Sequence, residues 1–147
     1  MEKSGFALHV LLIEDDPFQR EIIREYLEIE GRYEVHEAKG VHHALAMCEY
    51  VRPRIDVVLI DMKITTLDMV ELLLAIRERR PDMAILGVTD RPVDYYEEPR
   101  LRTSRAGFIP SLFTPHHLNR SIQAVIRAGS PNHWRRTPTM RAGARQF

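Results

Sequence analysis

The sequence predicts an α/β fold: a doubly wound, five-stranded parallel sheet flanked by about five helices. Two observations along its 147 residues indicate this class. Short β-rich apolar runs alternate with longer segments of helical period, as in folds that place helices on both faces of a sheet. Most of these runs lack polar alternation, which is typical of strands covered on both faces. The apolar fraction of 44% further indicates one domain with a packed core.

The first predicted strand is Leu8–Ile13, an apolar run broken only by His9. A helix is expected to follow it, because Asp16 suits the N-cap position and Pro17 suits the first helical position. Gly31 is expected to end this helix, since glycine readily adopts the left-handed conformation that closes many helices.

The next segments are Tyr33–Ala38, a polar and therefore more exposed strand, and Val41–Tyr50, a helix stopped by Pro53. Val57–Ile60 is predicted as a buried strand. Its last apolar residue is followed at once by Asp61.

The second half of the chain continues the alternation. Leu67–Arg77 has helical spacing, Ala84–Val88 is a buried strand ending at Thr89, and Phe108–Ile109 is a short last strand. Residues 91–105 contain two prolines and a charge run, so they form either a short broken helix or a loop.

The last predicted helix begins at Thr114–Pro115 and carries an apolar stripe up to Gly129. The predicted organisation is an N-terminal extension at 1–6, a domain at 7–128, and a basic, flexible tail or linker start at 129–147.

Charge and cysteine content exclude several functions. Basic and acidic residues both number 21, so the chain has no overall attraction for nucleic acid or membrane. Trp134 beside Arg135 and Arg136 is weak evidence for nucleic-acid contact, and no direct DNA binding is expected. Cys48, expected in the core, is the only cysteine. The apolar run Val10–Ile13 is too short for the core of a signal peptide or for a membrane span. A cytoplasmic location is therefore expected.

Two pairs of adjacent histidines, His42-His43 and His116-His117, invite a metal-binding interpretation. Neighbouring residues of a helix do not share a face, so each pair is a poor set of joint ligands. We expect these histidines to be solvated at helix ends.

Polar residues follow the buried strands at the edge where ligands bind in such sheets. Glu14, Asp15 and Asp16 follow the first strand, Asp61 follows a central strand and Thr89 the next one. Converging carboxylates repel each other, and a hard cation such as Mg²⁺ relieves that repulsion. A carboxylate can also attack phosphorus to form an aspartyl phosphate, which the Thr89 hydroxyl could hydrogen-bond.

The order of these segments resembles the receiver domain of bacterial response regulators, over residues 7 to 128, and this resemblance implies a flavodoxin-like fold. The matching segments are Val57–Asp61, Met62–Leu73, Ala84–Thr89 and Ala106–Ser111. No single motif is specific to this family, but the four segments in this order and at this spacing are together a strong indication of it.

The resemblance also implies a role for each matching residue. Asp61 would be the phosphoacceptor, Thr89 the switch hydroxyl and Phe108 the switch aromatic; Mg²⁺ would be held by Glu14, Asp15, Asp61 and the backbone carbonyl of Lys63.

The chain departs from the family pattern at Ser111, where the family has a lysine that contacts the acceptor carboxylate and the phosphoryl group. Serine is too short and uncharged for that task. Lys63 or Arg91 could supply a substitute cation. In the loop after Asp61, Ile64-Thr65 replaces the usual Met-Pro, and Met69 stands where glycine is usual.

By this resemblance the chain is a signalling module, not a dedicated enzyme, although it could dephosphorylate itself. Its expected partners are a histidine kinase or phosphotransfer protein and a downstream protein target, with a homodimer as a further alternative. The 19 residues after Ala128 are too few for a helix-turn-helix output domain.

Two other functions compete with this one. The first is a pseudo-receiver, a phosphorylation-independent interaction domain. The second is a Mg²⁺-dependent phosphatase, which is disfavoured because Met62-Lys63 follows Asp61 where an Asp-x-Asp pair would be needed.

Overall fold

A computed structural model describes residues 7–50, 54–62, 69–90 and 106–128 of the protein. Its strands are β1 (Leu8–Ile13), β2 (Tyr33–Glu37), β3 (Val57–Asp61), β4 (Ala84–Thr89) and β5 (Ala106–Pro110). The helices of the described part are α1 (Pro17–Glu30), α2 (Val41–Tyr50), α3 (Met69–Arg79) and α5 (Pro115–Arg127). The predictions for residues 1–6, 91–105 and 129–147 lie outside the described residues.

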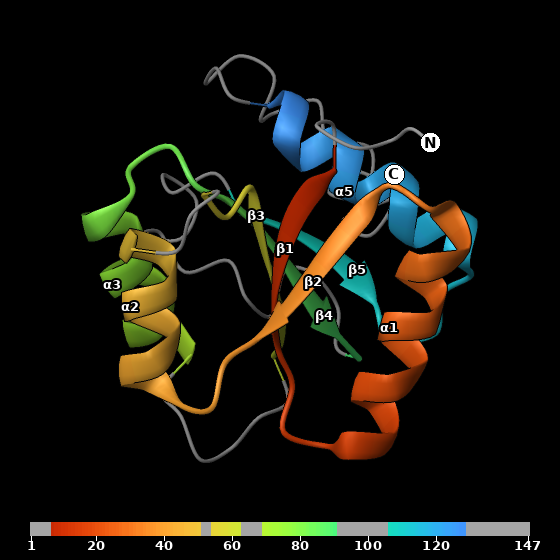
Figure 1. Ribbon diagram of the computed structural model, residues 1–147, viewed down its shortest axis with the longest axis horizontal. Helices are drawn as coiled ribbons and strands as arrows, with labels where there is room; N and C mark the ends of the chain where they lie inside the picture. Colours follow the sequence, from red (N-terminus) through yellow and green to blue (C-terminus); the bar gives the residue numbers. More distant parts are fainter. Residues whose placement is uncertain (1–6, 51–53, 63–68, 91–105, 129–147) are drawn as a thin grey trace.

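The five strands form one parallel sheet in the order β2-β1-β3-β4-β5. Helices α2 and α3 lie on one face and α1 and α5 on the other (Figure 1). Alternate residues of β1 point to the two faces: Leu11 packs with the α2 and α3 cluster, whereas Leu12 packs with the α1 and α5 cluster. The predicted α/β class and the burial of the central strands on both faces are confirmed.

Helix ends follow the predicted capping residues. The Asp16 side chain accepts a hydrogen bond from the Phe18 amide (Oδ1–N 3.0 Å), and Pro17 opens α1. Gly31 closes α1 with a φ of 74°, a conformation that favours glycine. The Thr114 hydroxyl caps α5 by accepting from an amide of its first turn.

Several element ends differ from the prediction. Asp61 and Thr89 are the last residues of β3 and β4 because pairing with the neighbouring strand continues past the apolar run. The strand predicted at Phe108–Ile109 spans five residues for the same reason. Strand β2 ends at Glu37, one residue early, and α3 continues to Arg79, two residues past its predicted end, stopping before Pro81.

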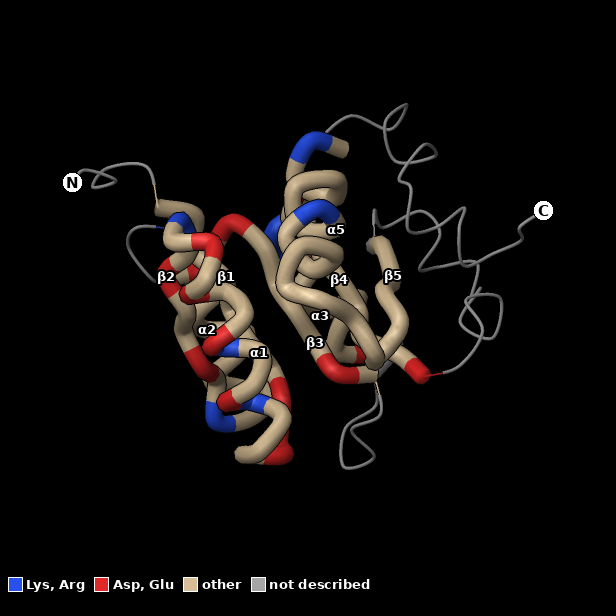
Figure 2. The backbone as a smooth tube through the Cα atoms, turned by 90° about the vertical axis from the view of Figure 1, so that its right-hand side faces the viewer, with Lys and Arg blue, Asp and Glu red and all other residues tan. Residues whose placement is uncertain are grey.

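The polar segment predicted as an exposed strand is the edge strand β2, and most of its residues are half-buried. Figure 2 shows charged segments along β2 and α1, whereas β4 is almost entirely uncharged. Cys48 is buried, as predicted for a core residue, and burial raises the pKa of its thiol to about 11. None of the helices in the described ranges combines the length and the apolar character needed to cross a membrane.

Candidate functional site

The acidic residues predicted at the strand ends meet at the centre of the sheet. Strands β1 and β3 are neighbours, although β2 lies between them in the sequence, so the strand order reverses at this point. Ligands of such sheets bind beyond the carboxyl ends of the strands at this position. Here Glu14 and Asp15 follow β1, and Asp61 ends β3. One carboxylate oxygen from each of the three lies within 4.8 Å of the others.

Two of these three carboxylates are buried. Glu14 and Asp61 are each 6% exposed, whereas Asp15 is exposed. Burial is the main cause that raises the pKa of Glu14, from 4.5 to about 7. The Asp16 amide opposes this rise by donating a hydrogen bond to the Glu14 carboxylate (N–Oε2 3.1 Å), and the carboxyl of Asp61 adds to it. At this site, burial therefore favours the protonated form of Glu14.

Thr89 and Phe108 lie on the strands beside this cluster. Thr89 is 2% exposed and ends β4, one residue beyond Val88, the register partner of Asp61. Phe108, on β5, is also buried and lies opposite Gly87 of β4. The threonine and the aromatic predicted to work together are thus on adjacent strands.

Gly87 makes room for the aromatic side chain. A Cβ atom placed on it would lie 3.0 Å from both Phe108 Cδ1 and Met62 Cγ, at the tight end of real packing contacts, so these side chains would have to shift. Met62 follows Asp61 directly and is buried, and its amide donates to the Val88 carbonyl (N–O 2.8 Å). The absence of a side chain at Gly87 therefore lets Phe108 and Met62 pack closely against β4.

Ser111 follows β5 directly, and the preceding Pro110 pairs with Thr89, so the residue is placed at the same edge of the sheet. Its side chain is half-buried. The two substitute cations considered from the sequence, Lys63 and Arg91, lie outside the described residues. The histidine pairs of α2 and α5 belong to neither group of potential metal ligands in the described part of the chain.

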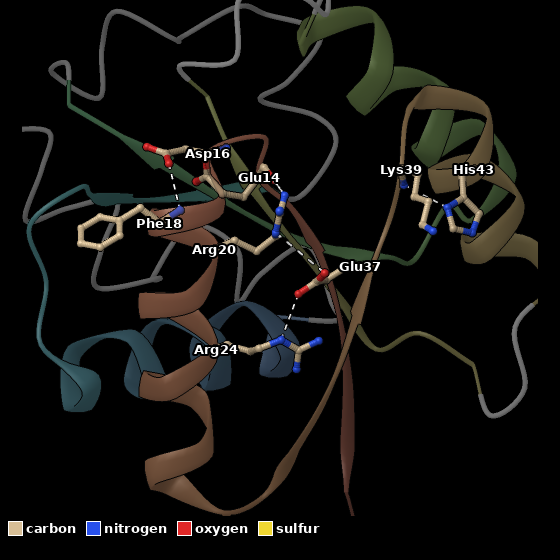
Figure 3. A network of polar contacts seen from close by, with 8 residues as sticks. All are labelled: Glu14, Asp16, Phe18, Arg20, Arg24, Glu37, Lys39 and His43. Carbon is tan, nitrogen blue, oxygen red and sulfur yellow. Dashed lines mark hydrogen bonds and ion pairs between the residues drawn. The ribbon is translucent and has the colours of Figure 1, made fainter.

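Arg20 is a neighbour of the site that sequence reasoning missed. Its guanidinium donates to the backbone carbonyl of Glu14 (Nη1–O 2.9 Å) and lies 3.8 Å from the Glu37 carboxylate, as Figure 3 shows. Arg24 completes the group with a closer contact to Glu37 (Nε–Oε2 2.9 Å). The sequence did place Arg20 close to Glu14, because it lies in the first helical turn after that residue. The direction in which the Arg20 side chain points, however, depends on how α1 packs.

The cluster suits a hard divalent cation. Mg²⁺ prefers oxygen ligands and commonly binds through one or two carboxylates together with phosphate oxygens. Glu14, buried and with a raised pKa, would gain from such a cation, since positive charge favours its ionised form. A carboxylate beside a phosphate bound in this way has the chemistry of a phosphoryl acceptor.

Comparison with known proteins agrees with this arrangement. The profile of the family described as response regulator receiver domain matches residues 10–123. The sensor kinase CckA of Brucella abortus (strain 2308) is 28% identical over 123 residues, which cover 84% of this chain and 13% of that protein. The chain thus spans about an eighth of the length of this curated relative.

Solved structures show the same fold. A CheY-like receiver domain protein from Methanospirillum hungatei JF-1 superposes with a TM-score of 0.70 at 24% identity, covering 86% of this chain and 98% of that one. A receiver domain protein from Clostridium thermocellum gives 0.69 at 26% identity, covering 82% and 94%. The receiver domain of the hybrid histidine kinase CckA gives 0.62 at 21% identity, covering 80% and 98%. The chain therefore belongs to the response regulator receiver domain family of two-component signalling proteins.

Proposed function

We propose that the chain is a phosphoacceptor receiver domain, phosphorylated on Asp61 by a histidine kinase or phosphotransfer protein. The observation that carries this proposal is the approach of Glu14, Asp15 and Asp61 to within 4.8 Å at the point where the strand order reverses. Family membership supports the same function, because receiver domains act in two-component systems.

Mg²⁺ is the cofactor that this donor set fits. Glu14, Asp15 and Asp61 would hold it, with the backbone carbonyl of Lys63 as a fourth ligand by family resemblance. When bound, Mg²⁺ would neutralise negative charge on the carboxylates and on the phosphate oxygens. Its binding would also favour ionised Glu14, whose pKa is raised mainly by burial.

The chemical step is a phosphoryl transfer to a carboxylate. An Asp61 oxygen forms the new O–P bond while the N–P bond of a phosphohistidine on the partner breaks, and the released imidazole nitrogen takes up a proton. Thr89 would then donate its hydroxyl to a phosphoryl oxygen. Phe108 would follow Thr89, because the two residues lie on adjacent strands. Receiver domains are generally not dedicated enzymes; we propose that this one also hydrolyses its own aspartyl phosphate.

Output would occur by protein contact, in the cytoplasm, with a downstream protein that recognises the phosphorylated state. The chain's similarity to part of a sensor kinase supports an upstream kinase or phosphotransfer partner. As a second form of output, the phosphorylated surface would bind another copy of the chain and form a homodimer.

The acceptor is tested by adding acetyl phosphate and Mg²⁺ to the full chain and measuring intact mass. Wild type should gain one phosphoryl group, and Asp61→Asn should gain none. Asp16→Asn is the matched control: it removes a neighbouring charge, and asparagine caps helices as well as aspartate does. Labelling of Asp61→Asn at the wild-type rate would contradict the proposal.

Ser111 favours a second candidate function, a phosphorylation-independent pseudo-receiver that works as an interaction module. Without the family lysine, binding of a phosphoryl group is less well coupled to a change of shape. Beryllofluoride with Mg²⁺ separates the two functions in wild-type protein. If the amide signals of Thr89 and Phe108 shift in wild type but not in Asp61→Asn, the result supports the phosphorylation switch. If no shift depends on Asp61, the result supports the pseudo-receiver.

The substitute cation is tested separately. If Lys63 takes the place of the missing lysine, Lys63→Ala should slow labelling by acetyl phosphate. Arg91→Ala tests the other candidate. Unchanged rates in both variants would reject the idea and leave Ser111 without a compensating cation.

A further inference from the structure

A second group of potential metal ligands lies on the other side of β1. His9 of β1 is the register partner of Glu34 of β2, and His36 follows Glu34 by two residues, so all three side chains leave the same face of the sheet. One ligand atom from each lies within 4.8 Å of the other two. Strand β2 is the edge of the sheet (Figure 1), so this group lies at its margin.

The group is separate from the acidic cluster. His9 lies near the start of β1, whereas Glu14 follows its last residue, Ile13. His9 and Ile13 are four positions apart, which corresponds to about 13 Å along an extended strand. The two sites differ in chemistry as well, because the acidic cluster offers only oxygen whereas this group offers two imidazole nitrogens and one carboxylate.

The two imidazoles are arranged as ligands of one ion would be. His9 Nδ1 lies 3.0 Å from His36 Nε2, and the ring centroids are 5.2 Å apart with planes inclined by 29°. Two nitrogens bound tetrahedrally to Zn²⁺ at about 2.0–2.1 Å lie roughly 3.3 Å apart. An opening of a few tenths of an ångström would therefore admit the ion between the two rings.

The backbone around His9 is held in place. Its amide donates to the Asp56 carboxylate (N–Oδ2 2.7 Å), and its carbonyl accepts from the Asp56 amide (2.8 Å). Both histidines are half-buried, whereas Glu34 is exposed. A tetrahedral ion held by the three side chains would thus direct its fourth position to solvent, where water can complete the coordination.

We propose that His9, Glu34 and His36 form a Zn²⁺ site that joins the edge strand β2 to β1. Two imidazoles and a carboxylate are a ligand set found in zinc proteins, and imidazole selects Zn²⁺ over Mg²⁺. The bound ion would link two strands across their register and stabilise the exposed edge of the sheet. The site is independent of the proposed phosphorylation of Asp61.

The test is calorimetric titration of the full chain, without a histidine tag, with ZnCl₂ in excess MgCl₂ at about pH 7.5, where ordinary histidines are neutral. Wild type should bind one equivalent of Zn²⁺, and Asp61→Asn should do the same. His36→Gln and Glu34→Gln should each lose at least about tenfold in affinity, because each removes a ligand.

The matched control is His42→Gln with His43→Gln, which removes two exposed histidines of α2 that belong to neither ligand group. Its Zn²⁺ affinity should stay within about twofold of wild type. If His36→Gln kept full Zn²⁺ affinity, the proposal would be overturned, and the contact between His9 and His36 in wild type would be a hydrogen bond only. Equal losses in the control and in His36→Gln would also overturn it.

A measurement on wild-type protein covers the case in which a variant fails to fold. Side-chain nuclear magnetic resonance should show the His9 and His36 ring signals shifting with one equivalent of Zn²⁺. Shifts confined to the Glu14 and Asp61 region, with both rings unchanged, would contradict the site.

Discussion

The two groups of potential metal ligands lie at different places along β1: the histidine group includes a residue of this strand, and the acidic group includes the residues that follow it. The acidic group uses residues at the carboxyl ends of two central strands, and two of its three carboxylates are buried. The histidine group uses residues within an edge strand pair, where the rings are half-buried and the carboxylate is exposed. The first is placed by the direction of the strands, and the second by their register.

This difference has an energetic consequence. Burial raises the pKa of Glu14 to about 7, so the acidic group is destabilised when it ionises without a cation. In the histidine group, by contrast, the two imidazoles can form a hydrogen bond with each other without a cation (Nδ1–Nε2 3.0 Å). Stability should therefore depend on a bound cation more strongly at the acidic edge than at β2. Four changes probe the two groups and the residues around them.

The largest expected effect is a pH dependence that Glu14 creates. Between about pH 4.5 and 7 the folded protein keeps the Glu14 proton while the unfolded chain releases it, so stability should fall as pH rises through this window. The difference between these pKa values corresponds to at most about 3 kcal/mol. Urea unfolding in EDTA, at pH 4.5 and pH 8, measures it.

Glu14→Gln should flatten this dependence, whereas Glu21→Gln, on the exposed side of α1, should preserve it. Added Mg²⁺ should stabilise wild type more at pH 8 than at pH 4.5. Equal pH dependence in Glu14→Gln and wild type would show that the buried carboxyl is not the cause.

The next effect tests the close packing of Phe108 and Met62 at Gly87 of β4. Gly87→Ala would press against Phe108 and Met62 and should lower the free energy of unfolding by about 1–3 kcal/mol. The penalty should be smaller in a Met62→Ala background, because that change restores space. Strictly additive losses in the double variant would argue against crowding.

A smaller effect is expected at the histidine group. Asp56→Ala removes the carboxylate that accepts from the His9 amide and should cost about 1.5 kcal/mol of stability. It should also weaken Zn²⁺ binding while leaving Mg²⁺ binding unchanged. Asp82→Ala is the control, since that side chain is 70% exposed and should change stability by less than about 1 kcal/mol. Equal losses from both variants would remove the role given to Asp56.

The smallest effect concerns the contact between α1 and the end of β2. Arg24→Gln removes an ion pair with Glu37 in which both side chains are about one-third exposed, so the loss should stay below about 1 kcal/mol. The loss should shrink further in about 1 M NaCl, which screens exposed charges. A salt-independent loss would indicate a packing role for the arginine stem instead.

The acidic site was largely predictable, whereas its surroundings were not. Parallel strands bring their carboxyl ends to one edge, so residues that follow buried strands must be neighbours there. From their order alone, that rule predicted that the three acidic residues from Glu14 to Asp16 would meet Asp61, and Glu14 and Asp15 do so. It could not predict the contact of Arg20 with the Glu14 carbonyl, because that depends on the direction in which α1 packs.

Strand ends were predicted with less accuracy than strand centres. Apolar runs mark where a strand is buried. Pairing with the neighbouring strand, however, extends β3 to Asp61 and β4 to Thr89. In the same way, α3 reaches Arg79 because nothing before Pro81 interrupts it.

By itself, the sequence determined the alternation of strands and helices, the caps at Asp16, Gly31 and Thr114, and the acidic strand ends. These follow from local preferences and from the direction of parallel strands. Only the tertiary structure decided that Glu14 is buried enough to raise its pKa, and that His9 lies opposite Glu34. Burial and register depend on which segments pack together, and residues 27 positions apart, such as His9 and His36, carry no local signal of their contact.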